Sequence, residues 1–220
     1  MDIVEIRHLK KYFKDGSQVV KALDGIDLSI EKGKFTAIAG ASGSGKTTLL
    51  NTIAGLYEPD EGTVIVDGLD LSKMGEEQLT VFRRRKIGFV FQGYNLIPEL
   101  TIKENIVFPL ALDDTRPDAA YFSNLVHLLG LDNYLDACPH MLSGGAQQCT
   151  AIARALITKP SIVLADEPTG SFDIKTTQNV AGLLKMTAAI FHQTLVVITH
   201  SLEFAQLADR VVRLQDGKIV

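Results

Sequence analysis

Residues 40–47, Gly-Ala-Ser-Gly-Ser-Gly-Lys-Thr, constrain the fold of this chain more than any other segment. The apolar residues 34–39 before them predict a buried strand, and residues 46–54 after them predict a helix. Glycines allow the loop to turn so tightly that several backbone N–H groups converge on one anion, and the positive end of the helix faces the same point. The segment therefore predicts an α/β fold with a phosphate-binding loop between a strand and a helix.

The order of residues in this loop assigns a role to its last positions. Lys46 is expected to reach the β- and γ-phosphates of a nucleotide, and the Thr47 hydroxyl is expected to bind Mg²⁺. The expected nucleotide contacts are Gly40, Ala41, Ser42, Gly43, Ser44, Gly45, Lys46, Thr47 and Thr48. Small-molecule kinases, GTPases, helicases and transport ATPases all use such a loop, so the rest of the chain must decide among them.

Two adjacent carboxylates follow a second apolar segment. Residues 162–165 predict a buried strand, and Asp166 and Glu167 come directly after it. The carboxyl ends of strands in α/β sheets are where ligands bind. We therefore expect Asp166 to hold the metal, directly or through water, and Glu167 to act as the general base that polarises an attacking water.

Composition narrows the class of protein. With 220 residues the chain is long enough for one large domain, and 46% hydrophobic residues exclude intrinsic disorder. The formal charge of −4 argues against a general nucleic-acid coat, and two cysteines argue against a disulfide scaffold. The most apolar stretches have the length of a strand, whereas a membrane-spanning helix needs about 20 apolar residues. Any role at a membrane is therefore expected to depend on a partner.

The order of predicted elements indicates the architecture. Strands predicted at 34–39, 87–91, 161–165 and 194–199 alternate with helices, which is typical of a mostly parallel sheet covered on both faces. Residues from 93 to about 159 are mostly helical in pattern, and no linker separates them from the rest. We expect this helical stretch to be an inserted subdomain rather than a separate domain.

A second glycine-rich segment lies in the helical stretch. Ser143-Gly144-Gly145 precedes a helix that is predicted to run to about Leu156. Ser143 is a good N-cap, and the paired glycines expose backbone N–H groups at the positive end of the helix. An ordinary capped helix would account for this segment alone, but two phosphate sites in one chain are unusual.

Together these motifs resemble the nucleotide-binding subunit of ATP-binding-cassette (ABC) transporters, over essentially all 220 residues. Ser143-Gly144-Gly145 resembles the signature motif of that family. Gln92 resembles the Q-loop glutamine, a ligand of Mg²⁺ and water, and His200 resembles the switch histidine that contacts the γ-phosphate. Tyr12 resembles the aromatic residue that stacks on adenine. Ser171-Phe172-Asp173 resembles the D-loop.

The resemblance implies a fold and a set of site residues. The fold is a P-loop NTPase (RecA-like) core with an N-terminal antiparallel β subdomain and an inserted α-helical subdomain. One ABC ATPase domain would cover residues 1–220, with the core and β subdomain in 1–92 and 159–220 and the helical subdomain in 93–158. The ligands would be ATP and Mg²⁺. The catalytic residues would be Glu167, His200 and Gln92, the metal ligands would be Thr47, Gln92 and Asp166, and Tyr12, Ser143, Gly144, Gly145 and Asp173 would contact the nucleotide.

The resemblance also implies two partners. Two copies of the chain would pair head to tail, so that Ser143, Gly144 and Gly145 of one copy cap the ATP on the phosphate loop of the other. The second partner would be an integral membrane permease, docked by residues after Gln92 that include Tyr94, Leu96 and Leu100. The permease would hold the chain in the cytoplasm, peripheral on the inner face of the cell membrane. No nucleic-acid partner is expected.

Residues 89–98 and 165–170 look most like one branch of the family, which contains the macrolide-exporter, lipoprotein-release, bacitracin-resistance and cell-division ATPases. This implies an ATPase that powers an exporter or a mechanotransmission complex. Four alternatives stay open: an amino-acid-type importer ATPase, an ATP-gated interaction switch with little hydrolysis, a soluble cassette acting on ribosomes or DNA, and a P-loop kinase. The last two usually carry a second cassette, a coiled-coil insertion or an acceptor-binding domain, which are not evident in this sequence.

Two signature positions depart from the family pattern. Ala146 stands where the family usually has Gln, which predicts weaker capping because a side chain near the partner's nucleotide is missing. Cys149 stands where the family usually has Arg, and we expect a small packing residue rather than a reactive thiol. A basic run at residues 83–86 is interpreted as a structural helix end rather than a site for lipid or nucleic acid.

Overall fold

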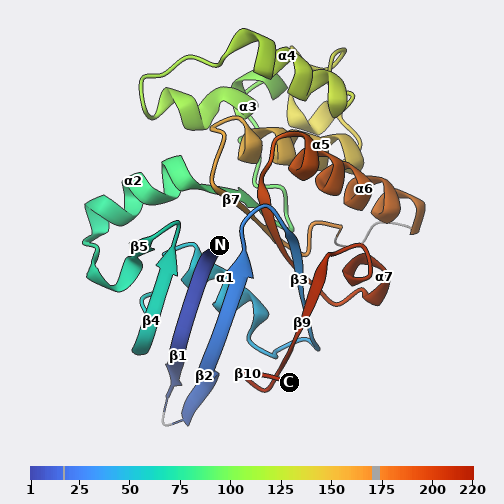
Figure 1. The fold of residues 1–220 in the computed structure, drawn as a ribbon. Helices are drawn as coiled ribbons and strands as arrows, with labels where there is room; N and C mark the ends of the chain where they lie inside the picture. Colours follow the sequence, from blue (N-terminus) through green and yellow to red (C-terminus); the bar gives the residue numbers. More distant parts are fainter. Residues whose placement is uncertain (17, 170–173) are drawn as a thin grey trace.

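The computed structural model describes residues 1–16, 18–169 and 174–220 of the chain. Figure 1 shows two β-sheets side by side, with a group of helices above the second sheet. The first sheet is antiparallel and has the order β2-β1-β4-β5. Its strands are β1 (Asp2–Asp15), β2 (Gln18–Glu31), β4 (Glu61–Val66) and β5 (Leu69–Asp70).

The second sheet has the order β10-β9-β3-β8-β7-β6. Its strands are β3 (Phe35–Ala39), β6 (Ile87–Val90), β7 (Ile162–Asp166), β8 (Thr194–Thr199), β9 (Arg210–Gln215) and β10 (Lys218–Ile219). The pairs β6–β7, β7–β8, β8–β3 and β3–β9 are parallel, and β10 pairs antiparallel with β9. The four strands predicted from the sequence are confirmed, with ends that differ by at most one residue.

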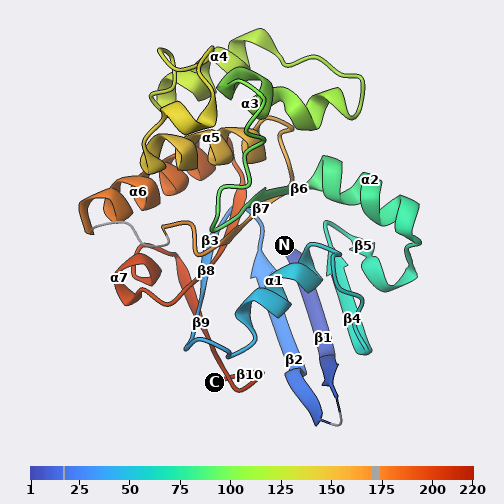
Figure 2. The ribbon, with the colours of Figure 1, turned by 180° about the vertical axis from the view of Figure 1, so that it is seen from behind.

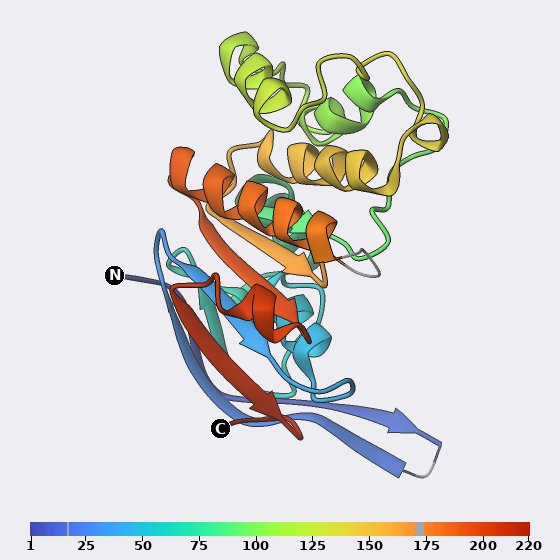
Figure 3. The same cartoon turned by 90° about the vertical axis from the view of Figure 1, so that its right-hand side faces the viewer.

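Helices cover both faces of the second sheet. The α-helices are α1 (Lys46–Ile53), α2 (Glu76–Lys86), α3 (Ile102–Ala111), α4 (Ala119–Leu128), α5 (Gly144–Leu156), α6 (Ile174–Ile190) and α7 (Leu202–Ala205), and the 3₁₀ helices are η1 (Leu71–Lys73) and η2 (Pro139–Met141). Helix α1 contacts strands of both sheets and lies between them (Figure 2). Helices α5 and α6 pack on each other, below α3 and α4 in the view of Figure 3.

Alternation along the buried strands creates two apolar cores. In β8, Leu195 and Val197 belong to the core shared with α3, α5 and α6, whereas Val196 and Ile198 belong to the core shared with α1 and the first sheet. Successive side chains of a strand point to opposite faces, so a strand that is buried on both sides is apolar throughout. The α/β class and the antiparallel β sheet expected from the sequence are both confirmed.

The basic run at the end of α2 is held by partners within the chain. Arg84 and Arg85 both pair with Asp113, and Lys86 Nζ lies 2.9 Å from a carboxylate oxygen of Asp67. Arg83 donates to the Gly55 carbonyl oxygen at 2.8 Å. These contacts give the run a structural role, because its cations join α2 to neighbouring segments.

Candidate active site

Four parallel strands deliver predicted residues to one edge of the sheet. Strand β3 leads into the glycine-rich loop, β7 into Asp166 and Glu167, β8 into His200 and β6 into Gln92. Because the strands are parallel, their carboxyl ends meet, and the edge bounds a cavity of about 960 Å³. The predicted residues that line this cavity are Ser42, Gly43, Gly45, Lys46, Thr47, Thr48, Gln92, Asp166, Glu167 and His200.

Two positions of the loop admit only glycine. Gly45 has φ of 102°, and a Cβ there would lie 2.3 Å from the Ala22 carbonyl oxygen. A Cβ on Gly40 would lie 2.2 Å from the Leu214 carbonyl oxygen. The loop therefore packs closely against the backbone of β2 and of β9.

The buried Lys46 closes the loop. It is 7% exposed, and its Nζ donates to the carbonyl oxygens of Gly40 and Ala41 at 2.9 and 2.8 Å. These carbonyl oxygens hold the ammonium beside the cavity. They replace the water molecules that the buried ammonium has lost. Three residues of the loop that we predicted as nucleotide contacts do not belong to the described lining of the cavity: Gly40, Ala41 and Ser44.

Asp166 and Thr47 form the hydroxyl and carboxylate pair expected of a metal site. The Thr47 side chain lies near enough to the Asp166 carboxylate to lower its pKa, and this carboxylate is half-buried at the end of β7. Burial raises the pKa of Asp166 above its usual range, and the neighbouring charge of Glu167 raises it further, whereas Thr47 and Lys46 act in the opposite direction. Among the described residues there is no group of three or more His, Cys, Asp and Glu that could hold a metal. An ion here would need hydroxyl, amide or ligand oxygens as well.

Glu167 is turned toward His200. Its φ is 44°, in the left-handed region that residues with a Cβ rarely adopt, and its backbone N–H donates to the Ile198 carbonyl oxygen at 3.0 Å. The side chain is 14% exposed, and its Oε2 lies 2.9 Å from His200 Nδ1. The same oxygen accepts from the His200 backbone N–H at 3.4 Å. The unusual backbone at Glu167 thus aims a mostly buried carboxylate along the cavity wall.

That Tyr12 stacks on the base of the nucleotide stays a prediction. The Tyr12 hydroxyl donates to Asp24 Oδ1 at 2.5 Å, and Tyr12 is absent from the described lining of the cavity. Phe13 lines the cavity in its place. Tyr12 and Phe13 are successive residues of β1, so their side chains point to opposite faces of the strand.

Residues from distant segments complete the cavity wall and were not predicted. The first sheet contributes Phe13, Val20, Lys21 and Ala22, and the turn between β9 and β10 contributes Asp216 and Gly217. The Gly217 N–H donates to the Ser44 carbonyl oxygen at 3.1 Å, which joins the turn to the loop. The aromatic Phe13 beside Tyr12 was the one sequence signal for this wall, whereas nothing in the pattern pointed to Asp216.

The second glycine site lies apart from this cavity. Ser143 caps α5, and its Oγ accepts from the Ala146 N–H at 3.3 Å. Ser143 is exposed, while Gly144 and Gly145 are partly exposed, and none of the three is among the described residues that line the cavity. Asp173, predicted as a further nucleotide contact, lies outside the described residues.

Cys149 is a packing residue. It is 8% exposed within the core shared by α5 and the second sheet. Burial raises the pKa of its thiol to about 11, so the sulfur stays protonated at neutral pH. The expectation of a small packing residue is confirmed.

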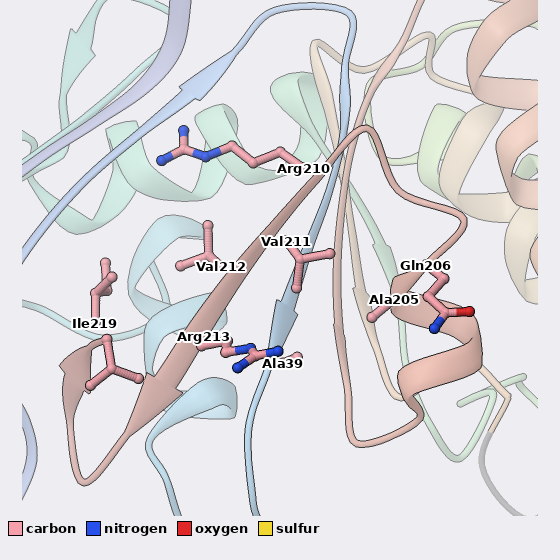
Figure 4. Close-up of a pocket in the computed structure, with 9 residues that line it drawn as sticks. Ala39, Ala205, Gln206, Arg210, Val211, Val212, Arg213 and Ile219 are labelled. Atoms are coloured by element: carbon pink, nitrogen blue, oxygen red, sulfur yellow. The ribbon is translucent and has the colours of Figure 1, made fainter.

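Two further cavities lie away from the strand ends. One, of about 420 Å³, is mostly apolar and lies among α2, β6 and α3, with walls that include Phe89, Phe91 and Phe108. The other, of about 590 Å³, lies beside β9, where Figure 4 shows Val211 and Arg213 near Ala39. The described walls of the second one carry no residue that the sequence singled out.

The family assignment follows from the sequence pattern of ABC transporters, which matches residues 23–170 and so spans the loop, the capped helix and the acidic pair. The chain belongs to the ABC transporter family. This ABC transporter chain is 39% identical over 217 residues to the lipoprotein-releasing system ATP-binding protein LolD of Shewanella frigidimarina, covering 98% of this chain and 91% of LolD. It is 38% identical over 221 residues to the bacitracin export ATP-binding protein BceA of Halalkalibacterium halodurans, covering 100% of this chain and 87% of BceA.

A solved structure is similar to this ABC transporter chain throughout. The dimeric, post-hydrolysis state of the ATP-binding cassette MJ0796, bound to ADP and Pi, superimposes with a TM-score of 0.88 at 38% identity, covering 98% of this chain and 96% of that one. MJ0796 is a protein of Methanocaldococcus jannaschii. These relatives confirm the expected branch, and the chain is an ABC transporter ATP-binding subunit. None of its described helices is both long and apolar enough to cross a membrane.

Proposed function

We propose that this chain binds MgATP in the 960 Å³ cavity and hydrolyses it to power a membrane exporter or mechanotransmission complex. The observation that carries the proposal is the meeting of four strand ends, which brings Lys46, Gln92, Asp166, Glu167 and His200 to one cavity. A phosphate loop, a buried carboxylate beside a hydroxyl, and a second carboxylate paired with a histidine are the groups that nucleotide hydrolysis needs.

The nucleotide would lie along the cavity with its phosphates at the loop. Backbone N–H groups of residues 42–47 and the first turn of α1 would hold the phosphate oxygens. Lys46 would exchange the carbonyl oxygens of Gly40 and Ala41 for phosphate oxygens, which carry more charge. The base would stack on Phe13, which lines the same cavity.

Mg²⁺ fits the donor set at the inner end of the cavity. The Thr47 hydroxyl, the Asp166 carboxylate and the Gln92 amide all offer oxygen, and all three residues line the cavity. Mg²⁺ prefers oxygen ligands and commonly takes only one or two carboxylates together with phosphates and water. When bound, it would neutralise charge that develops on the phosphate oxygens.

Hydrolysis would use the pair of Glu167 and His200. A water oxygen attacks the γ-phosphorus as the bond to the bridging oxygen of ADP breaks, and Glu167 accepts the proton that the water loses. The His200 side chain is 67% exposed, so it can reach from Glu167 toward a γ-phosphate at the mouth of the cavity. The φ of 44° at Glu167 supports this role because strained backbone is concentrated at functional sites.

A second copy of the chain is the proposed partner of the glycines at α5. The N-terminus of this 13-residue helix carries Ser143 at the surface, outside the cavity of its own chain. A helix N-terminus with exposed N–H groups binds anions, so it would cap the phosphates held by another copy. The similar MJ0796 cassette is dimeric, which supports pairing of two copies; the head-to-tail arrangement is our proposal.

An integral membrane permease is the second proposed partner, and it would keep the chain on the inner face of the membrane. The apolar cavity among α2, β6 and α3 supports this, because Leu56, Phe108 and Leu112 at its rim are 47%, 37% and 54% exposed. We propose that a cytoplasmic helix of the permease fills it. Residues 93–158 would then form a helical subdomain that moves with the permease, on the core of residues 1–92 and 159–220.

One observation favours a second candidate function, an ATP-gated switch that hydrolyses little. Ala146 lies in the first turn of α5 and offers its backbone N–H to Ser143, but no side chain to a partner's nucleotide. A steady-state phosphate-release assay separates the two functions, and Ala146→Gln tests the cause. If the chain is a slow switch because of Ala146, turnover rises in the variant.

The proposed transport role is tested by purifying a tagged Glu167→Gln chain from native membranes with MgATP and identifying its partners by mass spectrometry. An integral membrane protein with few helices and a large outer domain is the expected partner. A partner with many helices and a solute-binding protein would point to an importer. Recovery without any membrane protein would contradict the transport proposal.

A further inference from the structure

The loop that carries Gln92 has an unusual backbone. Tyr94 and Asn95 follow two and three residues later, and both have a left-handed backbone, with φ of 59° and 48°. Residues with a Cβ rarely adopt this conformation, and two in succession are rarer. Such a segment keeps its shape only when the surrounding structure holds it.

Arg154 is one group that holds this segment, in addition to backbone bonds from the Tyr94 and Asn95 N–H groups to the carbonyl oxygens of Phe91 and Gly93. Its Nη1 donates to the Asn95 carbonyl oxygen at 2.5 Å, and its Nη2 donates to the Tyr94 carbonyl oxygen at 2.7 Å. Arg154 is half-buried on α5, so the two carbonyls replace water that the guanidinium has lost. The planar guanidinium with two donors fixes both the position and the orientation of the loop.

A second side chain fixes the far end of the same loop. Asn105 on α3 is fully buried, accepts from the Ile97 N–H and donates to the carbonyl oxygens of Ile97, Leu100 and Thr101. The stretch from 97 to 101 is therefore tied to α3. The stretch at 94–95, nearest Gln92, is tied to α5 by Arg154.

We propose that Arg154 is a positioning residue that holds Gln92 at the nucleotide and couples this loop to the signature helix α5. The inference rests on the proposed binding of MgATP. Ser143 lies eleven residues before Arg154 on the same helix, about 16 Å along its axis. A rigid helix thus has the cap for the partner's nucleotide at one end and the loop of Gln92 near the other. Displacing α5 displaces Gln92.

The same contact lies at the apolar cavity among α2, β6 and α3. Arg154 and Asn95 both line it, beside Phe91 and Ile97. An occupant of that cavity would touch the arginine and the loop at once. The geometry therefore links three places: the docking cavity, the cap at Ser143 and the metal ligand Gln92.

The test measures how much Mg²⁺ increases the affinity for a fluorescent ATP analogue, by titration with Mg²⁺ and with EDTA. Arg154→Met is expected to lower this Mg²⁺-dependent gain about tenfold, as the loss of an outer-shell partner does, and to leave the affinity in EDTA unchanged. Gln92→Ala is expected to lower the gain similarly, and the double variant is expected to be no worse than Gln92→Ala. Arg154→Lys, which keeps one donor for one carbonyl, is expected to be intermediate.

Arg83→Met is the matched control. Arg83 lines the same cavity and also donates to a backbone carbonyl, that of Gly55, but it does not reach the loop of Gln92. Its Mg²⁺-dependent gain is expected to match the unsubstituted chain. A normal gain in Arg154→Met and Arg154→Lys, or additive losses in the double variant, would overturn the inference. An unsubstituted chain that fails to bind the analogue would instead contradict the proposed function, and the inference with it.

Discussion

The Nδ1 atom of His200 lies 2.9 Å from Oε2 of Glu167, although 33 residues separate them in the chain. The pair exists because β7 and β8 are parallel neighbours that end side by side. Asp166 opposes Ile198 in this register, so Glu167 and His200 both leave the sheet at the same edge. The carboxylate that we propose as the base is therefore oriented by a side chain from the adjacent strand.

Glu167→Gln is expected to lower the rate of phosphate release at least about 100-fold, because the amide cannot accept the proton of the attacking water. ATP binding is expected to persist, since Glu167 is not a phosphate ligand, and the variant is expected to dimerise with MgATP. Light scattering measures the dimer. Glu203→Gln, at an exposed glutamate of α7, is the control and should hydrolyse normally. A variant that stays monomeric with MgATP would refute the assigned base and the dimer.

Lys46→Ala is expected to abolish binding of a fluorescent ATP analogue. The substitution removes the buried ammonium, which both faces the phosphates and closes the loop onto Gly40 and Ala41. Equilibrium titration measures the affinity. Lys34→Ala, at an exposed residue before the opposite end of β3, should bind as the unsubstituted chain does. Undiminished binding by Lys46→Ala would show that the cavity is not the nucleotide site.

Phe13→Ala is expected to weaken ATP binding by about 1 kcal/mol or more, the usual contribution of one stacked base. Tyr12→Ala removes a side chain whose hydroxyl bonds to Asp24 and which is absent from the described lining of the cavity, so its ATP affinity is expected to be unchanged. Calorimetric titration of both variants separates the two aromatic residues. The opposite result, with Tyr12→Ala weakened and Phe13→Ala unaffected, would restore Tyr12 as the stacking residue.

Stability is expected to fall above pH 9 in part because of Cys149. The folded chain raises the pKa of this thiol from its ordinary 9.0 to about 11, so the folded state holds the proton more tightly than the unfolded state. The contribution is complete below pH 9 and is lost as the pH rises to 11. Between pH 8 and pH 10 the loss amounts to about 1 kcal/mol.

Urea unfolding at the two pH values measures this effect. Cys149→Ala removes the titrating thiol, so its stability should fall less over the same interval than that of the unsubstituted chain. Cys138→Ala, at the more accessible of the two free cysteines, serves as the control. Equal pH dependence in all three proteins would mean that Cys149 is not protected by the fold.

The sequence by itself determined the parts of this protein that depend on neighbouring residues. The strand at 35–39, the glycine loop and the helix from Lys46 form one continuous pattern, and the acidic pair after β7 is another. In each case the chemistry lies within a few residues of the element that supports it. Local propensity and glycine geometry are therefore sufficient to predict these parts.

Only the tertiary structure decided which distant side chains share the cavity. The first sheet brings Phe13 and Lys21 to it, and the β9–β10 turn brings Asp216 to the same wall. Arg154 also bonds to the loop that follows Gln92, and its partners Asn95 and Tyr94 lie 59 and 60 positions earlier in the chain. Such pairings follow from strand register and helix packing, which no local pattern encodes, because each is set by contacts between segments that are far apart in the chain.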